Sequence, residues 1–520
     1  MTNTAAAMRM LITYAICIPA AILVGYLLTN PLDYGTLGFI AFIIAILISP
    51  VFIKWHYPML FFGLACPAVC FFLPGKPPLW QVMVIISLGI AVVERTMSRE
   101  KLFISPAVMV WPLLFIAAMA YMTAELNGGV QLHAAGGDVG GGRKYITLFC
   151  GVAVFFAMTS QVIPPHRRNF YFGLYFLTGL SGLIGNLFPF LPHPLTAINL
   201  LFPPTMSLET EITESTRFTA LSFSVGSIIV FLLAKYGLGG ILSPQRPWRA
   251  LIFFAAILAS LLGGFRSSLA GLIMNLVLLF FLEGLHRTRL AMVVVLFVGL
   301  LGTVVVVCSD SLPYTFQRSL SFLPLKWRAD VVLDATGSSE WRYKIWRDTW
   351  PKVPEHLLLG KGYVLTKEDY DMIGQGTFAM LQASHIDASE ESLAISGDYH
   401  SGPLSALMPF GLWGGIGIVW LMGATGFVLY RNCKYGDPEL KPLNNFLLVT
   451  GISSFIAFYF IFGSFNDAIG EYAKLAGLSI AMNGGLGRSM VKERVNQLIK
   501  PRPVPLPEST LPIAHRQIPI

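Results

Sequence analysis

The stretch LAMVVVLFVGLLGTVVVVC, residues 290–308, carries no charged side chain and is long enough to cross a bilayer as one α-helix. It is followed by residues 309–402, the one long polar segment between apolar runs. That segment ends at Asp398-Tyr399-His400-Ser401-Gly402, where the next apolar run begins. The pattern predicts a membrane-spanning helix, then a large loop outside the bilayer, then a second span directly after His400.

The composition of the whole chain agrees with this prediction. Of its 520 residues, 55% are hydrophobic and only 12% are charged, and the mean hydropathy is +0.66. Soluble domains of ordinary composition have about 25% charged residues. The sequence therefore predicts an all-α polytopic membrane protein with about 12–14 transmembrane helices. The net charge of +8 does not indicate a nucleic-acid partner, because the basic residues stand in short clusters between apolar runs.

The apolar and polar segments divide the chain into four regions. Residues 1–308 are predicted to form the N-terminal transmembrane helices, residues 309–402 the large loop, and residues 403–484 the C-terminal transmembrane helices. Residues 485–520 are basic and rich in proline, which predicts an extended tail. The first apolar segment is followed by no small-residue cleavage site, so we expect it to be a retained helix.

The Lys and Arg residues of alternate short connections are distributed unevenly. One side carries 15 of them: Arg9, Lys54, Arg95, Arg99, Lys101, Arg167, Arg168, Lys235, Arg246, Arg249, Arg287, Arg289, Arg431, Lys434 and Lys441. The other side carries five: Lys76, Arg143, Lys144, Arg217 and Arg266. Cytoplasmic connections are enriched in Lys and Arg, so the first side is predicted to be cytoplasmic. Both termini then lie in the cytoplasm, and the large loop lies outside.

Two arginines on the predicted outer side stand at helix ends. Arg266 lies in the short turn of residues 263–268 between two apolar segments, and Arg217 precedes another apolar segment after an acidic stretch. Each has an ordinary interpretation: Arg266 binds a lipid headgroup or a helix C-terminus, and Arg217 pairs with a nearby glutamate. Two guanidinium groups at helix mouths can also form a bidentate clamp for a diphosphate.

His400 is the third candidate for a functional role. A histidine at a membrane surface is often only a polar residue at the interface. Imidazole is also a natural general base for a sugar hydroxyl. Asp398, two residues earlier, is a candidate to orient the ring. Both interpretations of His400 remain open at this point.

The large loop contains a predicted helix over residues 340–350, with Tyr343, Trp346 and Trp350 on one face. This aromatic face either packs at the membrane interface or stacks on sugars. Further along, Gly360-Lys361-Gly362 predicts a turn that allows close backbone approach. Three basic residues of the loop are candidate substrate contacts: Arg342, Arg347 and Lys361.

A metal site is not expected. Asp369-Tyr370-Asp371 matches the DxD pattern of metal-dependent glycosyltransferases, but such a match arises readily by chance in an acidic loop. We predict neither a metal nor a cofactor. The chain has no HExxH, GxSxG or Walker A sequence, which argues against a zinc protease, a serine hydrolase and an ATPase.

The order of these features resembles the O-antigen ligase and O-antigen polymerase superfamily of bacterial inner membranes. The resemblance rests on an ordered set: Arg217 at a helix start, Arg266 in a short outer turn, the loop run 339–350, Gly360-Lys361-Gly362, and His400 before a glycine-rich helix with Gly411, Gly414 and Gly415. It covers about Arg217 to Gly415. The sequence departs from the superfamily at Ser401, where asparagine often follows the histidine.

The resemblance implies a GT-C-like, metal-independent, inverting glycosyltransferase. Such an enzyme moves a glycan from undecaprenyl diphosphate to an acceptor hydroxyl on the periplasmic face of the inner membrane. The implied partners are this lipid-linked donor, an acceptor that is a lipid, a protein or a polysaccharide, and membrane lipids. By the same resemblance, Arg217 and Arg266 would hold the diphosphate, and His400 would deprotonate or orient the acceptor.

Three alternatives to a ligase remain. A polymerase of the same superfamily shares the donor and differs in the acceptor. A transporter of lipid-linked or anionic solutes would have ionisable residues deep in its helices and a repeat between its halves; the sequence shows mainly Lys474 and no clear repeat. A noncatalytic partner in an envelope polysaccharide machine is the third.

Overall fold

The computed structural model describes residues 14, 17–19, 21–22, 25, 34–73, 75–98, 103–130, 141–186, 192, 198–203, 219–365, 397 and 399–487. All regular elements among these residues are helices, apart from an isolated bridge between Val69 and Pro78. The predicted all-α class is therefore confirmed. The chain divides into two compact units, Met1–Met59 and Leu60–Ile520, which are described separately.

The first unit contains most of helix α2 (Tyr34–Ala65), which has Pro50 and Pro58 inside it. The connection predicted at Lys54 is wrong, because α2 passes through this position without a break. Residues 54–56 contain no glycine or proline that would stop a helix. The number of spans before residue 79 and the side on which the N-terminus lies stay predictions.

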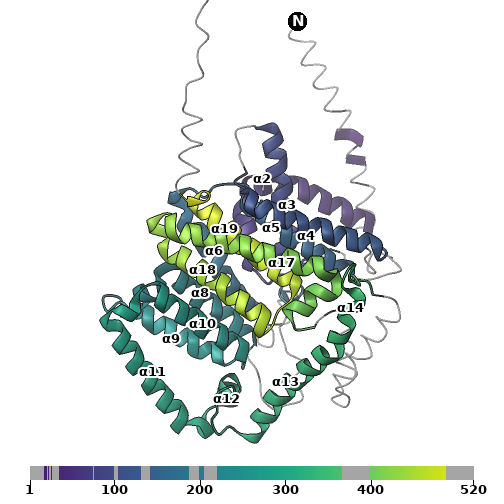
Figure 1. Cartoon of the computed structure of the whole chain (residues 1–520). Coiled ribbons are helices and arrows are strands. Elements are labelled where there is room, and N and C mark those ends of the chain that lie inside the picture. Colours follow the sequence, from purple (N-terminus) through teal and green to yellow (C-terminus); the bar gives the residue numbers. More distant parts are fainter. Residues whose placement is uncertain are drawn as a thin grey trace, which may run out of the picture. The chain divides into compact units, whose positions relative to one another are not determined.

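The second unit supplies the helices that position the candidate site (Figure 1). They are α3 (Leu79–Met97), α4 (Ala107–Leu126), α5 (Gly142–Met158), α6 (Arg168–Leu177), α7 (Leu183–Asn186), α8 (Thr219–Ile241), α9 (Pro247–Leu261), α10 (Arg266–Leu282), α11 (Arg289–Val307), α12 (Tyr314–Leu320), α13 (Ala329–Thr349), α14 (Val353–His356), α17 (Gly402–Tyr435), α18 (Lys441–Phe460) and α19 (Phe465–Asn483). Within the described part of the chain, six helices are long and apolar enough to cross a membrane: α3, α4, α8, α11, α17 and α18. Helices α9 and α10 are shorter but also apolar.

Helix α11 corresponds to the apolar stretch of residues 290–308. None of its residues is buried in the protein, although it is the most apolar of the six candidate spans. Water would not tolerate such a helix exposed on all sides, whereas lipid would. This helix supports the assignment of the chain as an integral membrane protein.

The helices of the second unit pack around α17, α18 and α19. Helix α19 lies against α5 and α17, α17 lies against α4, and α18 lies against α8 (Figure 1). Small residues allow the closest of these contacts. A Cβ atom at Gly151 of α5 would lie 3.3 Å from the backbone nitrogen of Gly470 in α19. Such close backbone approach is typical of helix pairs in membranes.

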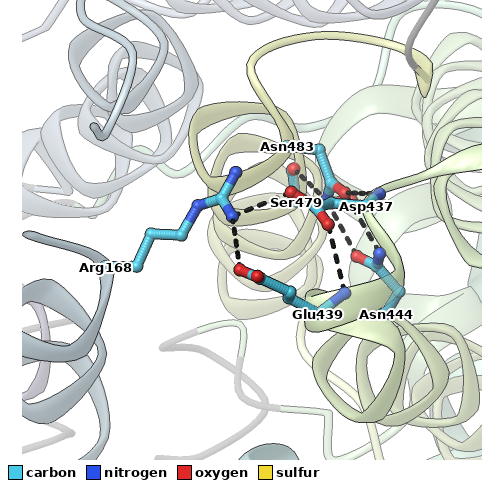
Figure 2. Close-up of polar contacts among 6 residues, drawn as sticks. All are labelled: Arg168, Asp437, Glu439, Asn444, Ser479 and Asn483. Carbon is cyan, nitrogen blue, oxygen red and sulfur yellow. Dashed lines mark hydrogen bonds and ion pairs between the residues drawn. The ribbon is translucent and has the colours of Figure 1, made fainter. Parts of the chain in front are cut away.

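A polar network joins the end of α19 to the connection between α17 and α18 (Figure 2). The side chains of Asn444 and Asn483 exchange two hydrogen bonds, of 3.1 and 2.8 Å, and Asn483 Oδ1 also accepts from the backbone nitrogen of Asp437 at 3.1 Å. Arg168 pairs with Asp437 at 2.9 Å and with Glu439 at 3.7 Å. The network places Arg168 beside the connection between α17 and α18. The basic residues of both connections were predicted to lie on the same side.

We expect Asn444→Ala to lower the free energy of unfolding by about 1–3 kcal/mol, because two hydrogen bonds to Asn483 are lost and Asn483 keeps only those to Ser479 and Asp437. Asn444 is 2% exposed. The matched control is Glu439→Gln, since the Glu439 side chain is 82% exposed and its ion pair contributes little. Thermal unfolding of the two purified variants and of the wild-type protein measures these effects. Equal unfolding temperatures for the two variants would contradict a stabilising role for the asparagine pair.

Candidate functional site

His400 lies at the junction between α17 and the end of α18. Its backbone is left-handed, with φ at 48°, which is uncommon for a residue other than glycine. The imidazole packs on the ring of Phe462, with 5.1 Å between ring centroids and 40° between ring planes. Gly402 lies directly against α18, where an added Cβ atom would come within 2.3 Å of the carbonyl oxygen of Phe458. Backbone strain that persists in a packed structure is often found at functional sites.

The segment before His400 is held by the helix of the large loop. The indole nitrogen of Trp346, in α13, donates a 2.9 Å hydrogen bond to the carbonyl oxygen of Tyr399. Tyr399 is 2% exposed and packs in a cluster with Ile345, Val353, Leu404 and Met408. Burial raises the pKa of its phenol, so the hydroxyl stays protonated. The loop is therefore anchored one residue away from His400.

The predicted helix of residues 340–350 is confirmed as the last part of α13, but its aromatic face is divided. Trp346 is partly buried against Tyr399, while Tyr343 and Trp350 are 66% and 54% exposed. Trp346 therefore serves to hold the loop. The exposed pair remains available for an interface or a sugar.

The predicted turn at Gly360-Lys361-Gly362 is confirmed, and its close backbone contact is with α17. The amides of Lys361 and Gly362 donate to the carbonyl oxygens of Met408 and Pro409 at 2.9 and 3.0 Å. These amides are thus used within the protein and do not face a phosphate. The Lys361 ammonium lies 5.9 Å from the centre of the Tyr399 ring, which places its charge beside the His400 segment.

The large loop also contacts the kink of α17, which follows Pro409. Gly411 has non-helical backbone angles, φ 62° and ψ −153°, and the amide of Leu412 donates to Leu357 of the loop at 2.7 Å. The loop thus supplies the hydrogen bonds that the helix loses at its kink. A Cβ atom at Gly411 would meet the Leu357 carbonyl oxygen at 2.4 Å, so only glycine fits.

Arg266 is the first residue of α10, and its turn is built by a second arginine. Arg318, in α12, is 6% exposed and donates a 2.7 Å hydrogen bond to the carbonyl oxygen of Gly264. Gly264 itself has φ 69°. The guanidinium of Arg266 reaches Ser339 of α13, at 3.5 Å from its hydroxyl. The short outer turn and the large loop therefore meet at the same end of the unit, as predicted from the sequence.

The start of α5 also contacts the large loop. The hydroxyl of Tyr145, in α5, accepts a 3.1 Å hydrogen bond from the amide of Tyr363 in the loop. The connection before α5, which carries Arg143 and Lys144, was assigned to the outer side because the short connections alternate between the two sides. Three connections predicted to lie outside thus share one end. This agreement supports the sidedness on which the site depends, although the membrane face itself stays a prediction.

The structure describes only some of the remaining predicted site residues. Arg347 pairs with its neighbour Asp348 at 3.1 Å, and both side chains are more than half exposed. Arg342 lies half-buried on α13. Arg217 and Asp398 lie outside the described residues, as do Asp369 and Asp371. A clamp formed jointly by Arg217 and Arg266, and the orientation of His400 by Asp398, therefore remain predictions.

The sequence interpretation missed Arg318 and the bond between Trp346 and Tyr399. Arg318 stands in a polar run, where an arginine that holds a turn looks the same as one that faces water. The sequence does contain one indication of such a contact, the glycine pair before Arg266. Glycines in sequence indicate a tight turn, and the carbonyl groups of a tight turn need a hydrogen-bond donor from elsewhere in the protein.

With this geometry in view, comparison with known proteins gives one match. Residues 251–419 match the O-antigen ligase family. The matched segment contains both Arg266 and His400, and it confirms the resemblance to the O-antigen ligase and polymerase superfamily. No curated protein and no solved structure matches the chain. This part of the chain is thus similar to the O-antigen ligase family, and the match names neither a donor nor an acceptor.

Proposed function

We propose that this protein is an inverting, metal-independent glycosyltransferase that moves a glycan from undecaprenyl diphosphate to an acceptor hydroxyl on the periplasmic face of the inner membrane. The observation that carries the proposal is the O-antigen ligase match, because it spans the two residues that the sequence assigns to chemistry. In addition, both regions form hydrogen bonds with side chains of α13: Arg266 with Ser339, and the carbonyl oxygen of Tyr399, next to His400, with Trp346.

Each residue has one task in the proposed reaction. The acceptor oxygen attacks the anomeric carbon of the donor sugar, and its proton passes to the imidazole of His400. The bond between that carbon and the phosphate oxygen breaks, and the diphosphate leaves with the electron pair. Arg266, together with Arg217, stabilises the charge that develops on this leaving group. Attack from the side opposite the diphosphate inverts the anomeric configuration.

A transfer assay in membranes tests the proposal. Membranes from a strain that lacks the protein receive either the wild-type chain or the vector alone, with a lipid-linked glycan donor. We expect transfer only with the wild-type chain, and transfer at the vector level would contradict the proposal. Excess chelator should leave the rate unchanged, whereas inhibition reversed by Mg²⁺ or Mn²⁺ would restore a metal role for Asp369 and Asp371.

The same strain separates ligase from polymerase. Both enzymes use the lipid-linked donor, so they differ in what accumulates when they are absent. Unattached polymer in the envelope indicates a ligase, because chain growth continues without transfer to the acceptor. Single repeat units indicate a polymerase. We favour the ligase because the description of the matched family names that activity.

A further inference from the structure

Three consecutive leucines of the large loop are exposed between α14 and the turn at Gly360-Lys361-Gly362. Leu357, Leu358 and Leu359 are 37%, 70% and 66% exposed. Single apolar side chains are common on a protein surface, whereas contiguous ones mark contact with a partner or with a membrane. The surroundings of these leucines therefore indicate what covers them.

The leucine segment is held by its backbone against α17, one of the candidate membrane spans. The amide of Leu412 donates a 2.7 Å hydrogen bond to the carbonyl oxygen of Leu357. A Cβ atom at Gly360 would lie 2.1 Å from the carbonyl oxygen of Pro409. Helix α14, which leads into the segment, lies beside the first part of α17 (Figure 1). The leucines thus have a fixed place along a helix that crosses the membrane.

The contacts between α17 and α4 show where this place is. A Cβ atom at Gly417 would lie 2.9 Å from the side chain of Ile116, and the hydroxyl of Thr425 donates to the sulfur of Met109 at 3.7 Å. Residue numbers rise along one helix as they fall along the other, so the two helices are antiparallel. Gly411 lies six residues before Gly417, which is about 9 Å along a helix axis. The kink of α17 is therefore level with the last turns of α4.

The turn that follows the leucines meets the ends of two other helices. A Cβ atom at Gly362 would lie 3.2 Å from the side-chain nitrogen of Asn127, which directly follows α4. A Cβ atom at Gly141, which directly precedes α5, would lie 1.6 Å from the carbonyl oxygen of Tyr363. A membrane span ends near a face of the bilayer. These contacts place the leucines at the membrane face where α4 ends.

The exposed side chains at this level belong to a lipid-facing surface. Leu412 and Trp413 of α17 are 46% and 50% exposed, and Tyr121 and Leu126 of α4 are 56% and 65% exposed. Both helices are candidate spans, so side chains exposed on them face lipid. Trp and Tyr are enriched where the membrane meets water. The leucine segment, bonded to Leu412, continues this surface.

We propose that Leu357, Leu358 and Leu359 insert into the lipid leaflet on the side of the large loop and anchor the loop there. Interfacial segments of this kind bury their apolar side chains about 5–10 Å into the boundary between headgroups and acyl chains. Lys352 and Lys361 stand on either side of the leucines in sequence. Lysine side chains can lie along apolar surface while the ammonium stays among the headgroups. The inference requires neither a glycan donor nor an acceptor, so it does not depend on the proposed function.

The test measures contact between the leucines and acyl chains. The full-length Leu358→Cys variant is labelled with a bimane fluorophore and placed in nanodiscs whose phosphatidylcholine carries brominated acyl chains, which quench the fluorophore on contact. Val298→Cys in α11, at a position 59% exposed, is the control for lipid, and Glu439→Cys, at a side chain 82% exposed, is the control for water. Wild-type protein taken through the same labelling gives the background from the native cysteines.

We expect the bromolipid to quench Leu358→Cys to an extent close to that of Val298→Cys and far above that of Glu439→Cys. Leu359→Cys repeats the measurement at the neighbouring residue, and unfolding temperatures show that each variant is folded. Quenching at both leucine positions no greater than at Glu439→Cys would overturn the proposal.

Two other occupants give different results. If another part of the loop covered the leucines, neither the bromolipid nor iodide in the water would quench the label, and this would overturn the proposal. If a second copy of the chain covered them, the bromolipid would quench the label in nanodiscs that hold one copy but not in those that hold two. That result would also overturn the proposal, whereas equal quenching in both kinds of nanodisc supports lipid as the occupant.

Discussion

Replacement of His400 by alanine is expected to lower the rate of glycan transfer by about 10²- to 10⁴-fold, the usual contribution of a general base. The imidazole packs on Phe462 at the start of α17, so the variant loses a proton acceptor in a fixed place. The rate is measured in membranes that contain equal amounts of each variant. His356→Ala, in α14 of the same loop, is the matched control and should transfer at the wild-type rate.

The left-handed backbone of His400 allows the loss of chemistry to be separated from the loss of folding. Alanine is strained at a φ of 48°, whereas glycine is not. We therefore expect His400→Gly to unfold at or above the temperature of His400→Ala while transferring equally poorly. Parental transfer by both variants would show that His400 is not the base. Partial transfer by His400→Gln would favour a role in orienting the acceptor, since an amide does not accept the proton.

The sequence predicted the all-α class and one shared end for the Arg266 turn and the His400 segment, because both depend on local patterns. An uncharged run such as residues 290–308 has few alternatives to a membrane span, and the sidedness of Arg266 and His400 follows from the basic residues of short connections. The continuous helix through Lys54 was missed for a related reason: one basic residue indicates a helix end, but nothing near it stops the helix.

The contacts that build the site were not predictable in the same way, because they join residues far apart in the chain. The turn at Gly360-Lys361-Gly362 was expected from its glycines, but nothing local shows that its amides meet the kink of α17 at Met408 and Pro409. Arg318 likewise acts on Gly264, 54 residues earlier. Such pairings depend on how the helices pack, and one sequence carries no record of that packing.

Replacement of Arg266 by lysine is expected to lower transfer by about 10²- to 10³-fold, the effect of removing one donor to a developing negative charge. Lysine keeps the charge but loses the planar fork that binds two phosphate oxygens together. Arg287→Lys is the matched control, because Arg287 lies in the turn just beyond the other end of α10 and should leave the rate unchanged. Wild-type turnover in Arg266→Lys would exclude the diphosphate clamp.

The position of Arg266 separates this role from a structural one. The sequence left open that Arg266 binds a lipid headgroup or a helix C-terminus, and the structure places it as the first residue of α10. A cation there opposes the helix dipole, at a cost of about 0.3–1 kcal/mol, unless an anion binds beside it. We therefore expect Arg266→Gln to unfold at or above the wild-type temperature in the absence of lipid phosphate, and to gain less than wild type when undecaprenyl diphosphate is added. A lower unfolding temperature without the lipid would instead indicate that Arg266 holds the turn, as Arg318 does, and that the anion is bound elsewhere.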